Sequence, residues 1–214
     1  MPRTADPEMR SRILDAADRL LARHGFQRMT IDGIADEAAI GKGSVYLHFD
    51  SKEDVALSCI DRMAASVLAR LEAIAGSRGA APSRLREMLR VRVLARFDYA
   101  RAHAPSIDEK LAVMRQAMLE RRGSHFAAEA AVLARVIEEG RRAGALRSSQ
   151  PAQAGQALVT ATNALLPYSL SVRELGRRAD LARRTDAVVD LLLAGLTARG
   201  SVSQRLKSPT WRKS

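Results

Sequence analysis

Apolar residues recur at helical spacing along most of the chain. Ile13, Leu14, Ala17, Leu20 and Leu21 form one such face near the N-terminus, and comparable faces follow between turn residues further on. No stretch rich in Val, Ile, Thr and Tyr alternates with polar residues, so the pattern indicates no sheet. Ala, Leu and Arg, which enter helices at little cost, are abundant. The sequence therefore predicts an all-α protein of about nine helices.

Turn and capping residues set the expected helix boundaries. Asp6 and Pro7 begin a first helix that Gly25 ends, and two short helices follow, the second at 42–48. The longer helices are expected at 51–75, at 83–101, at 107–121, at 124–142, from Pro151 onward, and from Asp180 to Arg199. Gly123 is expected to separate the sixth helix from the seventh.

These elements are expected to form three parts. Residues 1–52 are predicted to be a three-helix domain that contains a helix-turn-helix and binds DNA. Residues 53–199 are predicted to be a helical bundle for ligand binding and dimerisation. Residues 200–214 are polar and basic, and such a composition favours a disordered tail.

The segment 30–49 carries the functional signal. Two short helices separated by a break at 39–41 match a helix-turn-helix, whose second helix lies in the major groove of DNA. Lys42 supplies positive charge, hydroxyl and imidazole groups can donate to phosphate, and Gly43 lets the backbone approach closely. The expected DNA-binding residues are Thr30, Lys42, Gly43, Ser44, Tyr46, His48 and Lys52.

The distribution of charge does not by itself locate the DNA-binding surface. The formal net charge is +11, yet residues 1–57 hold 8 Lys and Arg against 10 Asp and Glu. Arg3 and Arg10 are candidates to reach phosphate or the minor groove from the N-terminal arm. Lys52 is either a phosphate contact or a solvated side chain at a helix start. The acidic balance keeps a second hypothesis open, a helical ligand-binding protein whose helix-turn-helix no longer reads DNA.

The N-terminal segment resembles the TetR/AcrR family of regulators over about its first 57 residues. The shared pattern comprises Ile13-Leu14, Ala16-Ala17, Leu20, Gly25-Phe26, Thr30-Ile31, Ile34-Ala35, Lys42-Gly43-Ser44, Tyr46, Phe49 and Ser51-Lys52-Glu53. Family members usually carry Gly where Ala39 lies, and often Ser or Thr at Gly41. A left-handed backbone at Ala39 costs about 1 kcal/mol more than at Gly. The resemblance implies a dimeric repressor on a palindromic operator, released by a small, largely apolar effector.

Two C-terminal segments are apolar around nearly their whole circumference, 154–166 and 187–196. Such a helix must be covered on every side. One interpretation is a central core helix of a monomer; the other, which the resemblance favours, is a two-fold four-helix interface. The expected interface residues are Leu158, Thr162, Leu165, Val188, Leu192 and Leu196.

Met and Phe side chains on the middle helices indicate either a filled core or an adaptable apolar cavity. The resemblance implies a cavity for the effector, with an expected volume of about 300 Å³ or more. The candidate lining residues are Met63, Val67, Met88, Val91, Phe97, Met114, Met118, Phe126 and Tyr168. Asn163 is a further candidate, either as a polar anchor in the cavity or as a dimer contact.

Little in the sequence supports an enzyme, a cofactor or a metal site. The four His residues share no metal-ligand spacing, and the single Cys59 excludes an internal disulfide and is expected to be buried. The run 41–44 lacks the spacing of a phosphate-binding loop. There is neither an apolar run of about 18 residues nor a signal-peptide core, so a cytoplasmic protein without a membrane partner is expected.

Overall fold

Eight α-helices account for the regular structure in the part of the chain that the computed structural model describes, residues 6–166 and 176–197. For residues 105–115 the backbone alone is described. The helices are α1 (Pro7–Arg28), α2 (Ile31–Glu37), α3 (Lys42–Tyr46), α4 (Lys52–Ala75), α5 (Ala81–Ala102), α6 (Ala104–Arg142), α7 (Pro151–Asn163) and α8 (Arg178–Leu196). Within these ranges β-pairing is limited to one isolated bridge, between Leu146 and Thr197. The all-α class is therefore confirmed.

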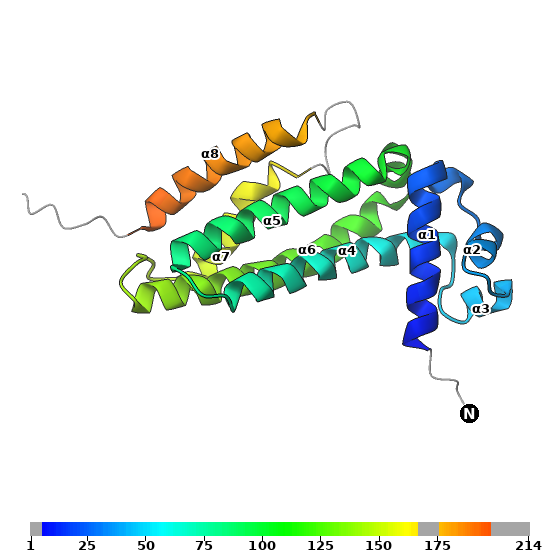
Figure 1. Cartoon of the computed structure of the whole chain (residues 1–214), viewed down its shortest axis with the longest axis horizontal. Helices are drawn as coiled ribbons and strands as arrows, with labels where there is room; N and C mark the ends of the chain where they lie inside the picture. The colour runs from blue at the N-terminus through cyan, green and yellow to red at the C-terminus, as the bar shows by residue number, and fades with distance from the viewer. Residues whose placement is uncertain (1–5, 167–175, 198–214) are drawn as a thin grey trace, which may run out of the picture.

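The helices form two units set crosswise. α4, α5, α6 and α8 run along the long axis of the molecule, whereas α1 crosses the end of this bundle (Figure 1). α2 and α3 lie on the outer side of α1. α6 packs against α1 as well as against α4, α5 and α7, so one helix contacts both units.

Separate apolar cores support the two units. The first contains the inward faces of α1, α2 and α3 together with residues 55–59 of α4. The second begins at Val67 of α4 and continues through α5 to α8. We call α1–α3 with residues 52–59 the head, and the remaining described residues the bundle. Met118 of α6 packs against the head core from the bundle side.

The predicted caps form at three helix starts. Asp6, Thr30 and Ser51 each accept a hydrogen bond from a backbone N–H two or three residues further on, at 3.0, 3.0 and 3.1 Å. Each cap pairs an N–H group that the first helical turn leaves without a partner. Gly25, predicted to end the first helix, has a φ of 81° and kinks α1 before its last residues up to Arg28.

The prediction of two helices separated at Gly123 is wrong. α6 runs through this position as one helix of 39 residues. Gly123 is exposed, and a Cβ there would meet nothing within 4 Å. A glycine in a helix interior costs about 1 kcal/mol relative to alanine, which packing against four other helices outweighs. The described residues therefore form eight helices rather than about nine.

Candidate nucleic-acid interface and central cavity

α3 has one buried and one exposed side. Val45 and, just beyond the helix, Phe49 lie in the head core with 0% and 2% exposure. Tyr46 and Leu47 between them are 51% and 68% exposed, although both are large and apolar in body. The head core thus holds α3 so that its outer side faces away from the bundle (Figure 1).

The turn between α2 and α3 places Ala39 in a left-handed conformation, with a φ of 52°. The turn is closed by the backbone N–H of Ile40, which donates to the carbonyl oxygen of Ala35 at 3.0 Å. This is the position where the sequence resemblance leads one to expect glycine. The chain therefore forms the tight turn with alanine and bears a strain of about 1 kcal/mol.

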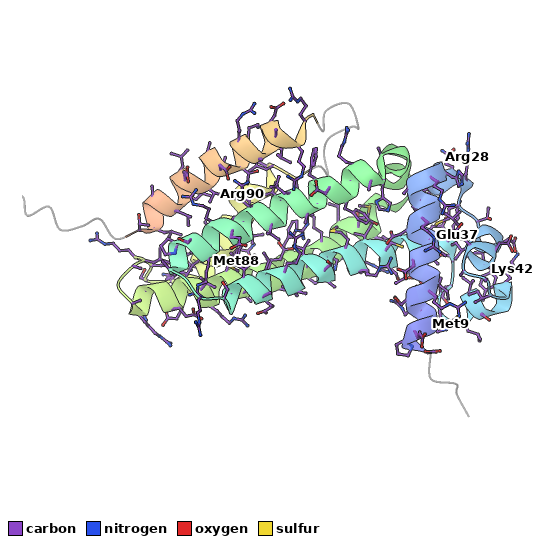
Figure 2. All side chains as sticks on the ribbon, in the orientation of Figure 1. Met9, Arg28, Glu37, Lys42, Met88 and Arg90 are labelled. Carbon is purple, nitrogen blue, oxygen red and sulfur yellow. The ribbon has the colours of Figure 1, made fainter. Side chains whose placement is uncertain are left out.

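Most of the predicted DNA-binding residues lie together on α3 and its flanks. Lys42 and Gly43 are exposed, and Ser44 and His48 are half-buried beside them. Figure 2 shows Lys42 at the outer edge of the head. A Cβ at Gly43 would meet nothing within 4 Å, so a large partner can approach the backbone there. Thr30 is exposed at the start of α2, where its hydroxyl serves as the cap.

Lys42 is paired with Asp32 of α2. Its Nζ lies 2.9 Å from Oδ1 of Asp32, and both side chains are exposed. The hydrogen bond to Asp32 raises the pKa of Lys42. An exposed pair of this kind is weak, so a phosphate group can replace the carboxylate. Asp32 nevertheless reduces the positive potential of this face.

Two predicted cations are held within the head. The Nζ of Lys52 lies 3.4 Å from each of two carbonyl oxygens at the end of α1 and 4.6 Å from the ring centroid of Phe26. The guanidinium of Arg10 lies 4.9 Å from the ring centroid of Phe49. Lys52 thereby places a positive charge at the carbonyl end of a helix, where it is stabilising. DNA contacts by Lys52 and Arg10 stay predictions, and Arg3 lies outside the described residues.

Leu47 was not among the predicted contacts. Its exposed side chain lies beside Tyr46 on the outer side of the head, where an apolar group can contact the methyl group of thymine. The signal was present in the sequence. Because Val45 and Phe49 both face inward, the residues between them must include ones that face outward.

Glu37 fixes α2 against α1. Its carboxylate lies 2.6 Å from Nε of Arg19 and 3.0 Å from Nη2 of Arg23. The hydrogen bond from Arg19, followed by that from Arg23, lowers the pKa of Glu37. Figure 2 shows Glu37 between the two helices. This clamp sets the orientation of α2, and with it that of α3, relative to α1.

A polar cluster around Asp18 joins the head to the bundle. Arg62 of α4 forms an ion pair with Asp18, and the hydroxyl of Tyr99 donates to it at 3.3 Å. The Nε2 of His103 lies 3.4 Å from the same carboxylate. Burial opposes ionisation of Asp18, but the contacts with His103 and Arg62 outweigh it and lower its pKa. One carboxylate of α1 therefore contacts α4, α5 and the residue that precedes α6.

A cavity of about 230 Å³ lies where α4, α5, α6 and the end of α7 meet. Its apolar wall includes Leu57, Ile60 and Met63 of α4 and Met118 and Phe126 of α6. This volume is smaller than the sequence-based expectation. Larger hollows of about 450 and 390 Å³ lie elsewhere on the molecule, but both are more open to solvent.

A buried ionic cluster lies behind this cavity. Arg92, Arg96 and Glu129 are only 0%, 2% and 1% exposed. Arg92 donates from Nε to Glu129 Oε2 at 2.6 Å and from Nη1 to the hydroxyl of Thr162 at 2.7 Å. Arg96 binds the other carboxylate oxygen of Glu129. The sequence-based prediction assigned no role to either arginine or to Glu129.

The predicted cavity residues fall into three groups. The residues that line the cavity are Met63, Met118 and Phe126. Those that do not line it, and pack in or against the bundle core instead, are Val67, Met88, Val91 and Phe97. These four residues therefore serve core packing. Figure 2 shows Met88 among the helices of the bundle. The side chains of Met114 and Tyr168 lie outside the described residues.

Comparison with known proteins gives a family match within the head. Residues 13–59 match the model of the bacterial regulatory proteins of the tetR family. The match to this family therefore covers most of the head. Among similar proteins, the uncharacterized HTH-type transcriptional regulator YerO of Bacillus subtilis is 34% identical over 96 residues, 45% of this chain. The match spans about a third, 32%, of that relative's length.

Several solved structures resemble most of the chain in fold. A transcriptional regulator from Cytophaga hutchinsonii has a TM-score of 0.74 at 19% identity, covering 87% of this chain and 97% of that one. SmeT, the repressor of the Stenotrophomonas maltophilia multidrug efflux pump SmeDEF, has a TM-score of 0.61 at 26% identity, covering 89% and 91%. A SmeT–triclosan complex has a TM-score of 0.63 at 22% identity, covering 96% and 100%.

The six predicted interface residues divide into two groups. Leu158, Thr162 and Leu165 are 3%, 0% and 7% exposed, because this segment packs into its own protomer. They therefore offer almost no surface to a second copy. The half-buried members are Val188, Leu192 and Leu196 of α8. The exposed apolar residues of this helix are Ala179, Ala187, Leu191 and Ala194, of which Leu191 is 77% exposed.

Two features are absent from the described part of the chain, a metal site and a membrane-spanning helix. No group of three or more His, Cys, Asp or Glu residues there could hold a metal ion. No helix among the same residues is long and apolar enough to cross a membrane. Cys59 is buried as expected, with its Sγ 3.8 Å from the carbonyl oxygen of Leu14.

Proposed function

We propose that this chain is a repressor that binds a palindromic DNA operator as a homodimer and releases it when a small, largely apolar molecule occupies the central cavity. The exposed side of α3 carries the proposal. Lys42, Gly43, Tyr46 and Leu47 face outward there, while Val45 anchors the helix in the head core. The similarity to the repressor SmeT supports the same class of function.

On DNA, α3 enters the major groove, and its residues make two kinds of contact. Lys42 and Ser44 contact phosphate, which positions the head without reading sequence. Tyr46 and Leu47 contact base edges, which supplies sequence preference. Two heads in one dimer read successive major grooves about 34 Å apart, so the operator is palindromic or nearly so.

The exposed stripe on α8 supports the dimer. Ala187, Leu191 and Ala194 follow one another at spacings of four and three residues and so lie on one face. A large apolar side chain as exposed as Leu191, flanked by small residues, suits a helix that packs against its counterpart. α7 and α8 of two copies would then form a four-helix interface.

The cavity contacts residues that belong to the head, which supports coupling between ligand and DNA. Leu57 and Met118 line the cavity, and both pack in or against the head core. A ligand in the cavity therefore contacts side chains that support the head. It lowers DNA affinity only if it prefers a head arrangement that does not fit two half-sites.

A second candidate is a helical ligand-binding protein that does not read DNA. It is favoured by two observations, the strained backbone at Ala39 and the pairing of Lys42 with Asp32. In that case the cavity would serve binding alone. A gel-shift experiment with the DNA upstream of the protein's own gene distinguishes the two, since only the repressor retards it specifically.

The salt dependence of binding tests the role of α3 more sharply. Lys42→Ala is expected to weaken operator binding and to reduce the slope of log K against log salt by about 2 for a dimer, since each lost phosphate contact changes it by about 0.9. Arg135→Ala removes the same charge from an exposed position on α6 and serves as the control. An unchanged slope for Lys42→Ala would remove that residue from the contacts.

Sedimentation equilibrium tests the dimer. Leu191→Asp places a charge on a side chain that is already 77% exposed in the protomer, so folding should be preserved while the interface is lost. Ala131→Asp, at an exposed position of α6, is the control and should remain dimeric. A wild-type chain that sediments as a folded monomer at micromolar concentration contradicts the proposal.

A further inference from the structure

The wall of the central cavity is basic on one side. Besides its apolar residues it contains Arg96, Arg121, Arg122 and His125. None of the described residues that line the cavity is Asp or Glu. Three guanidinium groups would not be expected in a pocket that encloses only a hydrocarbon, because burying a charge without a partner is costly.

Most of these basic groups are engaged by carboxylates outside the wall. Asp61 of α4 lies 2.5 Å from Nη1 of Arg121 and 3.2 Å from Nε2 of His125. Arg96 is bound to Glu129 in the buried cluster. These three side chains are therefore paired with carboxylates that are not among the residues lining the cavity.

Arg122 differs from its neighbours. It is half-buried, and among the described residues no carboxylate lies within ion-pairing distance of it. Its guanidinium instead lies 5.7 Å from the ring centroid of Phe126, which also lines the cavity. A guanidinium stacked on an aromatic ring keeps its planar edge of N–H donors for an anion, and a carboxylate matches that edge with two oxygens.

Asn163 adds a second donor to the wall of the cavity. Its Oδ1 accepts a hydrogen bond from Arg92, so the oxygen is occupied and the amide N–H groups are its remaining contribution. Asn163 lines the same cavity as Arg122. The polar side of the cavity thus offers donors from two helices, α6 and α7, and no carboxylate acceptor.

We infer that the cavity takes an amphipathic carboxylate, with its carboxylate bound by Arg122 and Asn163 and its hydrocarbon part along Leu57, Ile60 and Met63. This inference rests on the proposed function, since it treats the cavity as the effector site, and it narrows a largely apolar effector to an acid. The volume of about 230 Å³ restricts the ligand to a small one with a single chain or ring.

Isothermal titration calorimetry on the full chain, without DNA, tests the inference. The probes are octanoate and decanoate, each compared with the primary amide of the same chain length, which keeps the shape and removes the charge. The carboxylates should bind about tenfold or more tightly than the amides, because a hydrogen bond to a charged group is lost in the amide. Equal or tighter binding of the amides overturns the inference, as does the absence of binding by every carboxylate.

Two matched variants assign the effect to the cavity. Arg122→Gln should abolish the preference for carboxylate over amide while leaving amide binding within about twofold. Arg142→Gln removes the same charge from the same helix at an exposed position and should keep the preference. Unchanged decanoate affinity in Arg122→Gln contradicts the assignment.

The two proposals fail in different ways. If carboxylates bind but specific operator affinity does not change, the ligand response in the proposed function fails and the inference stands. If only neutral molecules bind and release DNA, the inference fails and the proposed function stands.

Discussion

The head and the bundle both contain ion pairs between arginine or lysine and a carboxylate, but those of the head lie at the surface and those around Glu129 are buried. In the head, Glu37 holds two arginines at the surface, and Lys42 meets Asp32 with both side chains exposed. In the bundle, Glu129 binds two arginines with almost no exposure. A surface pair contributes little and exchanges partners readily, whereas a buried pair becomes costly once one member is removed. The ion pairs of the head are therefore exchangeable surface contacts, while those around Glu129 fix the interior of the bundle.

The largest effect expected from this difference is at Glu129. Glu129→Ala leaves Arg92 and Arg96 in the interior without this carboxylate and should lower the free energy of unfolding by about 3–5 kcal/mol, measured by urea denaturation. Glu37→Ala, which also removes a carboxylate that binds two arginines, is the control and should shift the midpoint little because it lies at the surface. Equal losses in the two variants would show that burial does not separate the two regions.

Two glycines show that packing also differs between the bundle and the head. A Cβ at Gly155 of α7 would lie 2.5 Å from the backbone oxygen of Ala130 in α6, whereas one at Gly43 would meet nothing within 4 Å. Gly155→Ala should cost about 1–3 kcal/mol through overpacking. Gly43→Ala should leave thermal stability unchanged or slightly higher and weaken DNA binding alone. A stable Gly155→Ala variant would mean that α7 can move away from α6.

A smaller gain is expected in the turn of the head. Ala39→Gly relieves a left-handed alanine and should stabilise the chain by up to about 1 kcal/mol, less the entropy that glycine adds to the unfolded state. Gly41, which has a φ of −72°, offers the control, since Gly41→Ala introduces no such strain. A loss of stability in Ala39→Gly would contradict the strain at this turn.

The smallest effect concerns pH at the junction of the two regions. The folded state lowers the pKa of Asp18, so its carboxylate stabilises the fold at pH values above its ordinary pKa. That contribution is lost as the pH falls through the lowered value. Asp18→Asn should therefore reduce stability at neutral pH, and the difference from wild type should narrow below about pH 4. Urea denaturation midpoints of both proteins across this pH range test the prediction. A difference between variant and wild type that stays constant with pH would exclude this linkage.

The head was largely predictable because its signals are local. The caps at Thr30 and Ser51 and the inward positions at Val45 and Phe49 lie within a few residues of the elements that they define. The left-handed turn at Ala39 also falls where the resemblance expects glycine. Such features depend on neighbouring residues, which a sequence displays directly.

The bundle was predicted less well because long-range packing decides it. No role was predicted for Arg92 and Arg96, although they continue the stripe of Leu85 and Leu89 at intervals of three and four residues. From this stripe, the burial of both arginines could have been predicted. Gly123 looked like a stop, but tertiary contacts carry α6 through it. The cavity wall depends on which residues of four helices meet, and periodicity along one helix does not report this.

The continuity of α6 has a mechanical consequence. A helix of 39 residues is about 58 Å long, and this one extends from the end that packs on α1 to the far end of the bundle. Such a rod acts as a lever arm: a tilt of about 5° about its far end moves its near end by about 5 Å, more than one base-pair step of about 3.4 Å. A break at Gly123 would have absorbed this motion within the bundle. In the proposed function, an unbroken α6 would instead carry a small rotation beside the cavity to the end that packs on α1.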